Sequence, residues 1–215
     1  MERFFTMSSN NSQKTPFAQK ILSSSAVNLS NCPICGRTRF NHANKDLTLI
    51  IEGKGKLPDY LLCGHFPLII ISHRVIEAWG KYQIGGYESF PIRTVNAQGV
   101  EICREIQYQN VIITGRAELD YKKMDVKIVK ECSMCGGVEY NKDTWEFGTT
   151  IMKEGSYDNS DLFAFKHFEM APLCNLKVVK IIYEMKFTNF GFRNIDNKFN
   201  FFAPKIDAKD IIGIQ

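Results

Sequence analysis

Two short cysteine motifs decide the organisation of this chain: Cys32-Pro-Ile-Cys35-Gly36 and Cys132-Ser-Met-Cys135-Gly136. A two-residue spacer lets both sulfurs of a motif face the same ion, and the glycine that follows can adopt the left-handed backbone conformation that closes the turn. Two such turns supply four thiolates, which is the ligand set of a tetrahedral structural zinc site. We therefore expect Cys32, Cys35, Cys132 and Cys135 to bind one zinc ion together.

A single Cys-x-x-Cys motif has two other common explanations, a redox-active dithiol and a pair of buried thiols. The second copy, with the same trailing glycine, favours a shared metal site over both. The motifs are separated by 96 residues, whereas a local zinc ribbon separates its cysteine pairs by about 15 to 20 residues. The ion would therefore close a long loop, and four thiolates would leave it no open position for water or substrate.

A weak internal repeat accompanies the cysteine motifs. Residues 72–92 align with residues 175–195 without a gap at an offset of 103, and the cysteine motifs recur at an offset of 100. Both segments predict a helix, with Ser72 or Asn175 as its N-cap, followed by a turn and a short strand. Any two amphipathic helices followed by strands would align passably, so chance similarity is the alternative to duplication. The shared offset favours duplication.

The remaining periodicity indicates strands, most clearly over residues 99–115, 125–129 and 187–202. The predicted fold class is α+β, with antiparallel strands, a few helices and two pseudo-repeated halves joined by the four-cysteine zinc site.

The predicted domain organisation has two parts. Polar residues 1–25 indicate a solvated N-terminal arm rather than a transit peptide, although Phe4 and Phe5 could begin a short strand. Residues 26–215 are expected to form a single α+β domain stapled by zinc, with halves at about 26–115 and 116–215.

Composition excludes several classes of protein. The chain has 215 residues, of which 44% are hydrophobic and 23% charged, and this profile is typical of a globular rather than a disordered protein. A net charge of +4 permits nucleic-acid binding without indicating it. No apolar run approaches the roughly 18 to 20 residues of a membrane-spanning helix, and the N-terminus lacks the apolar stretch of a secretory signal. We expect a cytoplasmic protein that does not partner with the membrane.

Other chemistry-bearing residues favour no catalytic site. Cys63 and His65 lie close in sequence to His73, but no nucleophile elbow, oxyanion glycine run or acidic partner accompanies them. Cys63, like Cys103 and Cys174, is expected to be an inert core thiol. The lysine cluster between Lys122 and Lys130 is interspersed with acidic residues, which is typical of a solvated face. We therefore expect a protein that is not an enzyme.

Three motifs together carry a resemblance to a known family: the twin Cys-x-x-Cys-Gly turns, Asp161-Leu-Phe-Ala-Phe-Lys-His-Phe168 ahead of a capped helix, and Thr188-Asn-Phe-Gly-Phe192. The chain resembles the double-CXXCG motif proteins, first recognised as paralogues in myxobacteria, from Arg3 to about Ile195. It departs from that pattern in a short stretch at 36–68 and in a tail after Asn197.

The double-CXXCG family includes immunity proteins that are made beside a toxin delivered to neighbouring cells. The resemblance implies that this chain is a non-catalytic immunity protein that binds and neutralises a cognate antibacterial toxin, with zinc in a structural role. The alternative is a zinc-ribbon module that binds nucleic acid. A third hypothesis, a thiol oxidoreductase, would require one cysteine pair to be accessible and to have a lowered pKa.

Overall fold

The computed structural model describes residues 3–10, 15–21, 29–40, 47–63, 68–102, 106–197 and 204–213. Within these ranges the strands are β1 (Phe4–Ser9), β2 (Phe17–Ile21), β3 (Leu29–Asn31), β4 (Thr38–Phe40), β5 (Thr48–Glu52), β6 (Tyr60–Cys63), β7 (Ile70–Ser72), β8 (Tyr87–Val95), β9 (Tyr108–Ile113), β10 (Gly115–Ala117), β11 (Ile128–Glu131), β12 (Val138–Tyr140), β13 (Leu162–Phe165), β14 (Phe168–Asn175) and β15 (Phe190–Asn194). The helices are α1 (His73–Lys81), α2 (Leu176–Glu184) and α3 (Ala208–Ile212), with short 3-10 helices η1 (Thr144–Glu146) and η2 (Ile195–Asn197).

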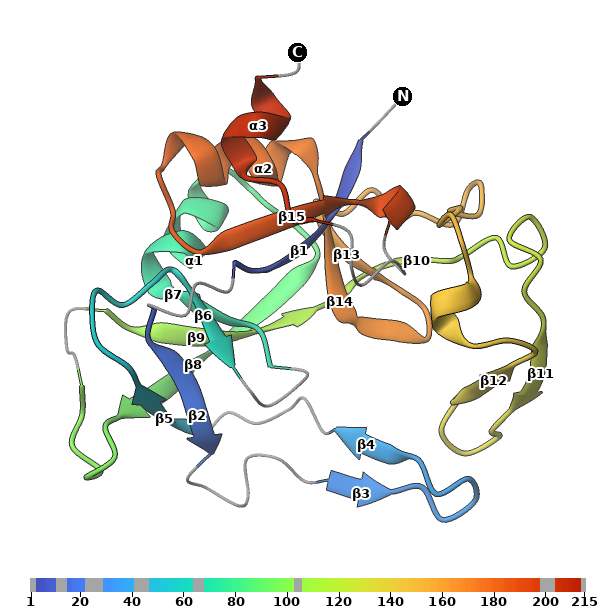
Figure 1. The fold of residues 1–215 in the computed structure, drawn as a ribbon, viewed down its shortest axis with the longest axis horizontal. Coiled ribbons are helices and arrows are strands. Elements are labelled where there is room, and N and C mark those ends of the chain that lie inside the picture. The colour runs from blue at the N-terminus through green and yellow to red at the C-terminus, as the bar shows by residue number, and fades with distance from the viewer. Residues whose placement is uncertain are drawn as a thin grey trace.

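The strands form two large sheets and two separate hairpins (Figure 1). Six strands close a barrel in the order β2-β5-β8-β9-β7-β6, and five form an open sheet in the order β10-β13-β14-β1-β15. The pairs β3-β4 and β11-β12 are two-stranded sheets of their own. The structure is therefore mixed α+β and rich in sheet, as predicted, although the closed barrel was not expected.

The pairing is not wholly antiparallel, which corrects the prediction. β2 pairs with β6, β5 with β8, and β10 with β13 in parallel. Each parallel pair is joined by a chain segment that contains other elements, because a tight turn can only join antiparallel neighbours. The segment between β5 and β8, for example, contains β6, β7 and α1.

The short strand that Phe4 and Phe5 were expected to begin is present as β1, but a solvated polar arm does not describe β1 and β2, which both lie in large sheets. β1 lies between β14 and β15 in the open sheet, where Phe5 and Met7 are 1% exposed. β2 is a strand of the barrel. Polar composition misled the prediction because β1 has neighbours on both edges, which satisfy its backbone groups and bury even Ser9. Residues 11–14 and 22–25 lie outside the described residues.

The two predicted helices are present at the same offset of 103, since α1 begins at His73 and α2 at Leu176. Asn175 caps α2 by accepting from the backbone N–H of Val178 at 3.3 Å, as predicted. Ser72 occupies the N-cap position of α1, but its hydroxyl donates to Asp59 instead. Both helices are followed by a residue with positive φ and then a strand.

Equivalent faces of the two helices enter one hydrophobic core. The buried residues are Val75, Ala78 and Trp79 on α1, and Val178, Val179, Ile181 and Ile182 on α2. Phe5, Met7, Val111 and Ile113 from the strands belong to the same cluster. Each of the larger buried side chains contributes on the order of 1.5 to 3 kcal/mol before the entropic cost of ordering it. This shared core meets the expectation from the repeat.

Asp59 joins the two halves from the loop before β6. Its carboxylate accepts from the Ser72 hydroxyl at 2.7 Å and from two nitrogens of Arg74 at 2.6 and 2.5 Å. It also accepts from the backbone N–H and hydroxyl of Thr188, in the turn after α2, at 2.7 and 3.0 Å. One acidic side chain therefore ties the start of α1 to the end of α2.

Asp161 makes the reciprocal connection. Its carboxylate accepts from Asn175 Nδ2 at 2.9 Å and from Lys177 Nζ at 3.1 Å, both at the start of α2. It also accepts from the backbone N–H of Gly85, in the turn after α1, at 3.0 Å. The start of each helix is thus held beside the end of the other. Sequence reasoning named Asp161 only as the first residue of a motif ahead of the second helix, and it did not identify Asp59.

Candidate metal centre

Each cysteine motif forms the turn of one separate hairpin, with matching backbone geometry. In the β3-β4 hairpin, Gly36 N donates to Cys32 O and Cys32 N to Arg37 O, both at 2.8 Å. In the β11-β12 hairpin, the equivalent bonds from Gly136 and Cys132 are also 2.8 Å long. Gly36 and Gly136 have φ of 70° and 63°, where a side chain would be strained. The trailing glycine therefore has the role that the sequence predicted.

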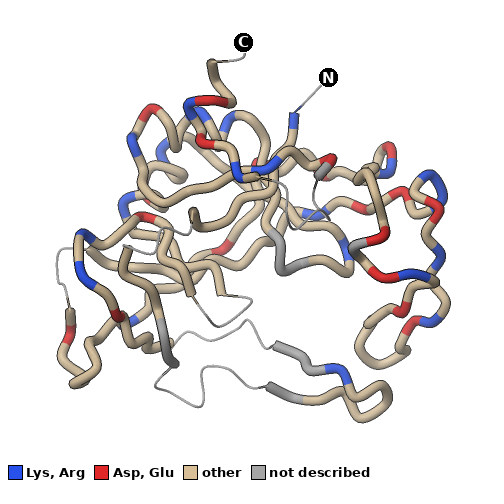
Figure 2. The backbone as a smooth tube through the Cα atoms, in the orientation of Figure 1, with Lys and Arg blue, Asp and Glu red and all other residues tan. Residues whose placement is uncertain are grey.

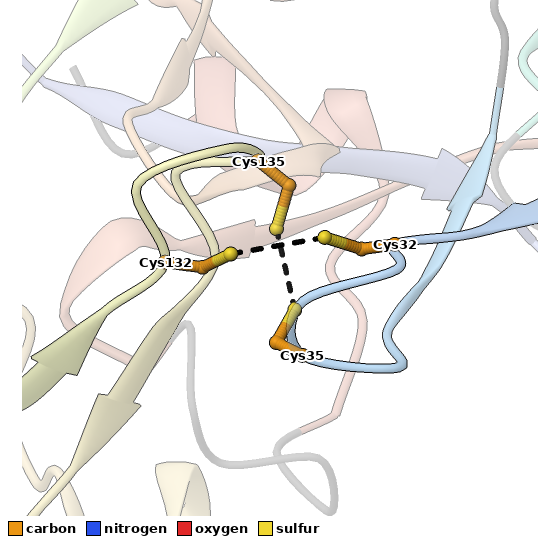
Figure 3. Close-up of side chains that lie close together, drawn as sticks. All are labelled: Cys32, Cys35, Cys132 and Cys135. Carbon is orange, nitrogen blue, oxygen red and sulfur yellow. Dashed lines mark hydrogen bonds between the residues drawn. The ribbon is translucent and has the colours of Figure 1, made fainter.

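The four predicted cysteines come together, and their sulfurs all lie within 4.8 Å of one another. The Sγ atoms of Cys32 and Cys132 are 3.7 Å apart, and those of Cys35 and Cys135 are 3.4 Å apart (Figure 3). A tetrahedron with metal–sulfur bonds of about 2.3 Å has edges of about 3.8 Å. The cluster therefore has the size of a four-thiolate metal site.

The two hairpins contribute to this cluster in the same way. The first cysteine of each motif is buried, with Cys32 3% and Cys132 5% exposed. The second cysteine of each motif, Cys35 or Cys135, is half-buried. One edge of the cluster is therefore nearer to solvent than the other.

Backbone groups around the buried cysteines favour the thiolate form. Hydrogen bonds from the backbone of Cys35 and Ile34 lower the pKa of Cys32 to about 6, against the opposing effect of burial. Backbone hydrogen bonds from Cys135 and Met134 likewise lower the pKa of Cys132. At Cys35 the backbone hydrogen bond from Arg37 lowers the pKa, but burial and the neighbouring cysteine side chains outweigh it and raise the pKa to about 11. Because a metal binds the thiolate rather than the thiol, the backbone of each turn prepares its first cysteine, Cys32 or Cys132, for a cation.

Arg37 connects the hairpins beside the cluster. Its guanidinium donates from Nη2 to the backbone carbonyl of Val138 in β12. A Cβ added to Gly137 would lie 3.0 Å from Arg37 Cδ and 3.1 Å from Cys135 Sγ, so this glycine leaves room for the arginine. Sequence reasoning did not identify this contact, although the second glycine of Cys135-Gly136-Gly137 was a signal for it.

The other residues considered from the sequence do not join the cluster. His73 begins α1, where its Nδ1 lies 2.6 Å from Gln109 Nε2 and its Nε2 lies 3.5 Å from Glu77. Cys63 is half-buried at the end of β6, and Cys174 is fully buried in β14, where burial raises the pKa of its thiol. His65 and Cys103 lie outside the described residues.

Positive and negative side chains alternate around the lysine cluster, as predicted. Figure 2 shows lysine and acidic positions interspersed along residues 118–131. Lys123 lies 3.5 Å from Asp120, and Lys153 lies 2.7 Å from Glu118.

Among the described residues, no helix has the length and apolar character needed to cross a bilayer.

Comparison of the chain with protein-family models found no match, and no curated protein matches it. The resemblance to the double-CXXCG motif proteins therefore rests on the sequence motifs themselves. One of those motifs, the twin Cys-x-x-Cys-Gly turns, carries the four clustered cysteines.

Proposed function

We propose that this chain is an immunity protein that binds and neutralises a cognate antibacterial toxin without catalysing a reaction, and that a structural zinc ion holds its fold together. One observation carries the proposal: two matching Cys-x-x-Cys-Gly turns, from hairpins far apart in sequence, bring four sulfurs within 4.8 Å of one another. These turns are the most specific motif of the family that the chain resembles.

The donor set supports zinc as the ion. Four thiolates in a tetrahedral cluster are typical of structural zinc sites, and soft sulfur ligands disfavour magnesium and calcium. Cys32 and Cys35 would bind it from one hairpin, and Cys132 and Cys135 from the other. Bound there, zinc would supply structural cross-linking rather than Lewis-acid chemistry, because thiolates fill its coordination shell.

The cross-link would act mainly on the unfolded chain. Joining residues about 100 positions apart removes an entropy worth up to about 4 to 5 kcal/mol from the unfolded state. The two hairpins belong to neither large sheet. Among the described residues, the sulfur cluster and the Arg37 contact join the two hairpins directly, which supports a stabilising role for the ion.

Exposed apolar side chains are the candidates for toxin contact. Among the described residues, Tyr82 is 38% and Tyr183 47% exposed, and both lie near the C-terminal ends of the long helices. Tyrosines of this kind often anchor protein interfaces because they bury a large area at a small entropic cost. Interspersed charges around them would disfavour wrong partners.

The test is co-expression with the toxin encoded by the neighbouring gene. Protection of growth and a stoichiometric complex that buries about 1,200 to 2,000 Å² in total would support the proposal. Tyr82→Ala and Tyr183→Ala should weaken toxin binding at least about tenfold without changing the unfolding midpoint. Val100→Ala, at a side chain that is 60% exposed on the loop between β8 and β9, is the matched control and should bind normally.

The outcomes separate the proposed role from its alternative. A neighbouring toxin that neither binds this protein nor is neutralised by it would overturn the immunity proposal. Salt-dependent binding to DNA or RNA would instead support the nucleic-acid module, because counterion release weakens such complexes steeply as salt rises.

A further inference from the structure

The two short sulfur contacts in the cluster both join one hairpin to the other. Cys35 Sγ lies 3.4 Å from Cys135 Sγ, and Cys32 Sγ lies 3.7 Å from Cys132 Sγ. Figure 3 shows these contacts as two crossing lines between the hairpins. A disulfide bond is about 2.0 Å long, so each pair would need to approach by less than about 2 Å.

We propose that these four cysteines are also a site of oxidation, at which a peroxide replaces the metal by two disulfides between the hairpins, Cys35–Cys135 and Cys32–Cys132. The proposal rests on the structural metal site of the proposed function. It adds a second, covalent way to hold the same two hairpins together.

The burial of the cysteines sets the order of the two reactions. Cys35 and Cys135 are half-buried, whereas Cys32 and Cys132 are buried. A small oxidant therefore reaches Cys35 or Cys135 first, and the other member of that pair lies 3.4 Å away. The buried pair reacts second, after loss of the metal has opened the cluster.

Each disulfide forms in two balanced steps. A thiolate of Cys35 attacks hydrogen peroxide, the O–O bond breaks, and a sulfenic acid and hydroxide form. The thiolate of Cys135 then attacks the sulfenic sulfur, the S–S bond forms, and the S–O bond breaks with loss of hydroxide. Two protons convert both hydroxides to water, so one peroxide is reduced as two thiolates are oxidised. Oxidation of Cys35 and Cys135 would leave a bound metal with only the thiolates of Cys32 and Cys132, which favours its release.

A contact independent of the metal keeps the hairpins adjacent during this exchange. Arg37 in the first hairpin donates to the carbonyl of Val138 in the second. The sulfurs of the second pair therefore stay near each other when the ion leaves. After both reactions the long loop remains closed, and a chelator can no longer open it.

The test uses the zinc-loaded, reduced full chain and hydrogen peroxide added in molar steps. Zinc release is followed with a chromogenic chelator, and the disulfides are mapped by mass spectrometry after alkylation and digestion. We expect zinc release to coincide with a Cys35–Cys135 cross-link, followed by Cys32–Cys132. EDTA should then lower the unfolding midpoint of the reduced protein but not that of the oxidised protein.

Disulfides within each motif, Cys32–Cys35 and Cys132–Cys135, would overturn the proposal, as would zinc release without a cross-link between hairpins. Cys63→Ser is the control and should give wild-type cross-links, whereas loss of the cross-link in this variant would show that Cys63 is the reacting partner. A protein that contains no zinc before oxidation would refute the metal site. The disulfide map would still decide the oxidation proposal separately.

Discussion

The molecule has a first half built on the barrel, β2 to β9 with α1, and a second half built on the open sheet, β1 and β10 to β15 with α2. The two halves share a strand order but differ in closure. The order β2-β6-β7-β9-β8 in the barrel has the counterpart β10-β13-β14-β1-β15 in the open sheet. In both, the first pair is parallel and the next pairs are antiparallel. The barrel is closed by β5, which bridges β2 and β8. Among the described residues, the second half has no closing strand in that place and shows isolated bridges instead, from Leu119 after β10 to Met152 and from Phe192 of β15 to Ile206.

Several features are common to both halves, whereas the burial of these features differs between them. Both have a cysteine hairpin, a helix and an aspartate that holds the turn of the other half. The aspartates are not equally embedded, since the side chain of Asp59 is 5% exposed and that of Asp161 is 14% exposed. The shared features connect the halves, so we expect their loss to destabilise the whole chain. The differences in burial predict how much the free energy of unfolding falls when each feature is removed.

We expect the largest loss of stability when one thiolate of the metal cluster is removed. The cluster joins two hairpins about 100 residues apart in sequence, so its loss removes a long-range cross-link between the two halves. Cys32→Ser should lower the free energy of unfolding by about 4 kcal/mol, measured by urea denaturation with zinc present. The control is Cys63→Ser, which removes a half-buried thiol outside the cluster and should cost about 1 kcal/mol or less. Equal losses in the two variants would argue against the cross-link.

The next effect concerns the turns after the helices. Gly86 has a φ of 91°, and a Cβ there would lie 1.9 Å from the carbonyl oxygen of Leu162. Gly86→Ala should therefore cost about 3 kcal/mol or more, because backbone must move. Gly99 has a φ of 78° with open space around its Cβ position, so Gly99→Ala isolates the backbone strain and should cost about 1 kcal/mol. Thermal unfolding of the pair measures the difference, and similar losses would mean that the Leu162 contact relaxes easily.

The two aspartates should respond in the order of their burial. Asp59→Ala leaves Arg74 and Thr188 without their acceptor and should cost about 3 kcal/mol. Asp161→Ala removes a more exposed carboxylate with a lysine partner and should cost about 1 kcal/mol. Urea denaturation of both variants gives the comparison. A larger loss of stability in Asp161→Ala than in Asp59→Ala would contradict this order. It would show that the contacts of Asp161 stabilise the fold more than those of Asp59.

The smallest effect is a pH dependence that belongs to one half. Burial alone would raise the pKa of Asp59, but hydrogen bonds from Arg74, Thr188 and Ser72 outweigh it and lower the pKa below 3.8. The stabilisation is therefore complete above about pH 4 and is lost as pH falls through the lowered folded-state pKa. Between about pH 4 and pH 2, the free energy of unfolding should fall less in Asp59→Asn than in wild type, because the amide does not titrate. Urea denaturation at several pH values measures this, and an equal fall in the two proteins would contradict the role given to Asp59.

The sequence predicted the local features of both halves. Ser72 and Asn175 marked the starts of α1 and α2, because a capping residue preceded an apolar pattern of helical period. The spacing of Cys32 and Cys35 predicted a turn with both sulfurs on one side. These features depend on a few neighbouring residues, and local physics decides them.

The non-local features could not be predicted in the same way. β1 has the sequence Phe4-Phe5-Thr6-Met7-Ser8-Ser9, which does not show that its partners are β14 and β15, about 170 to 190 residues away. The closure of the barrel by β5 depends on the register of two partner strands. Asp59 lies beside Pro58 in a loop, and only the packed structure brings Thr188 to it. Such pairings are settled by tertiary packing rather than by local pattern.

The most direct test of the central claim is the metal content of the folded protein. Elemental analysis of protein purified without chelator, alongside a circular dichroism spectrum that shows it folded, should give one zinc per chain, because Cys32, Cys35, Cys132 and Cys135 complete one tetrahedral shell. A folded chain that contains no zinc would contradict the account.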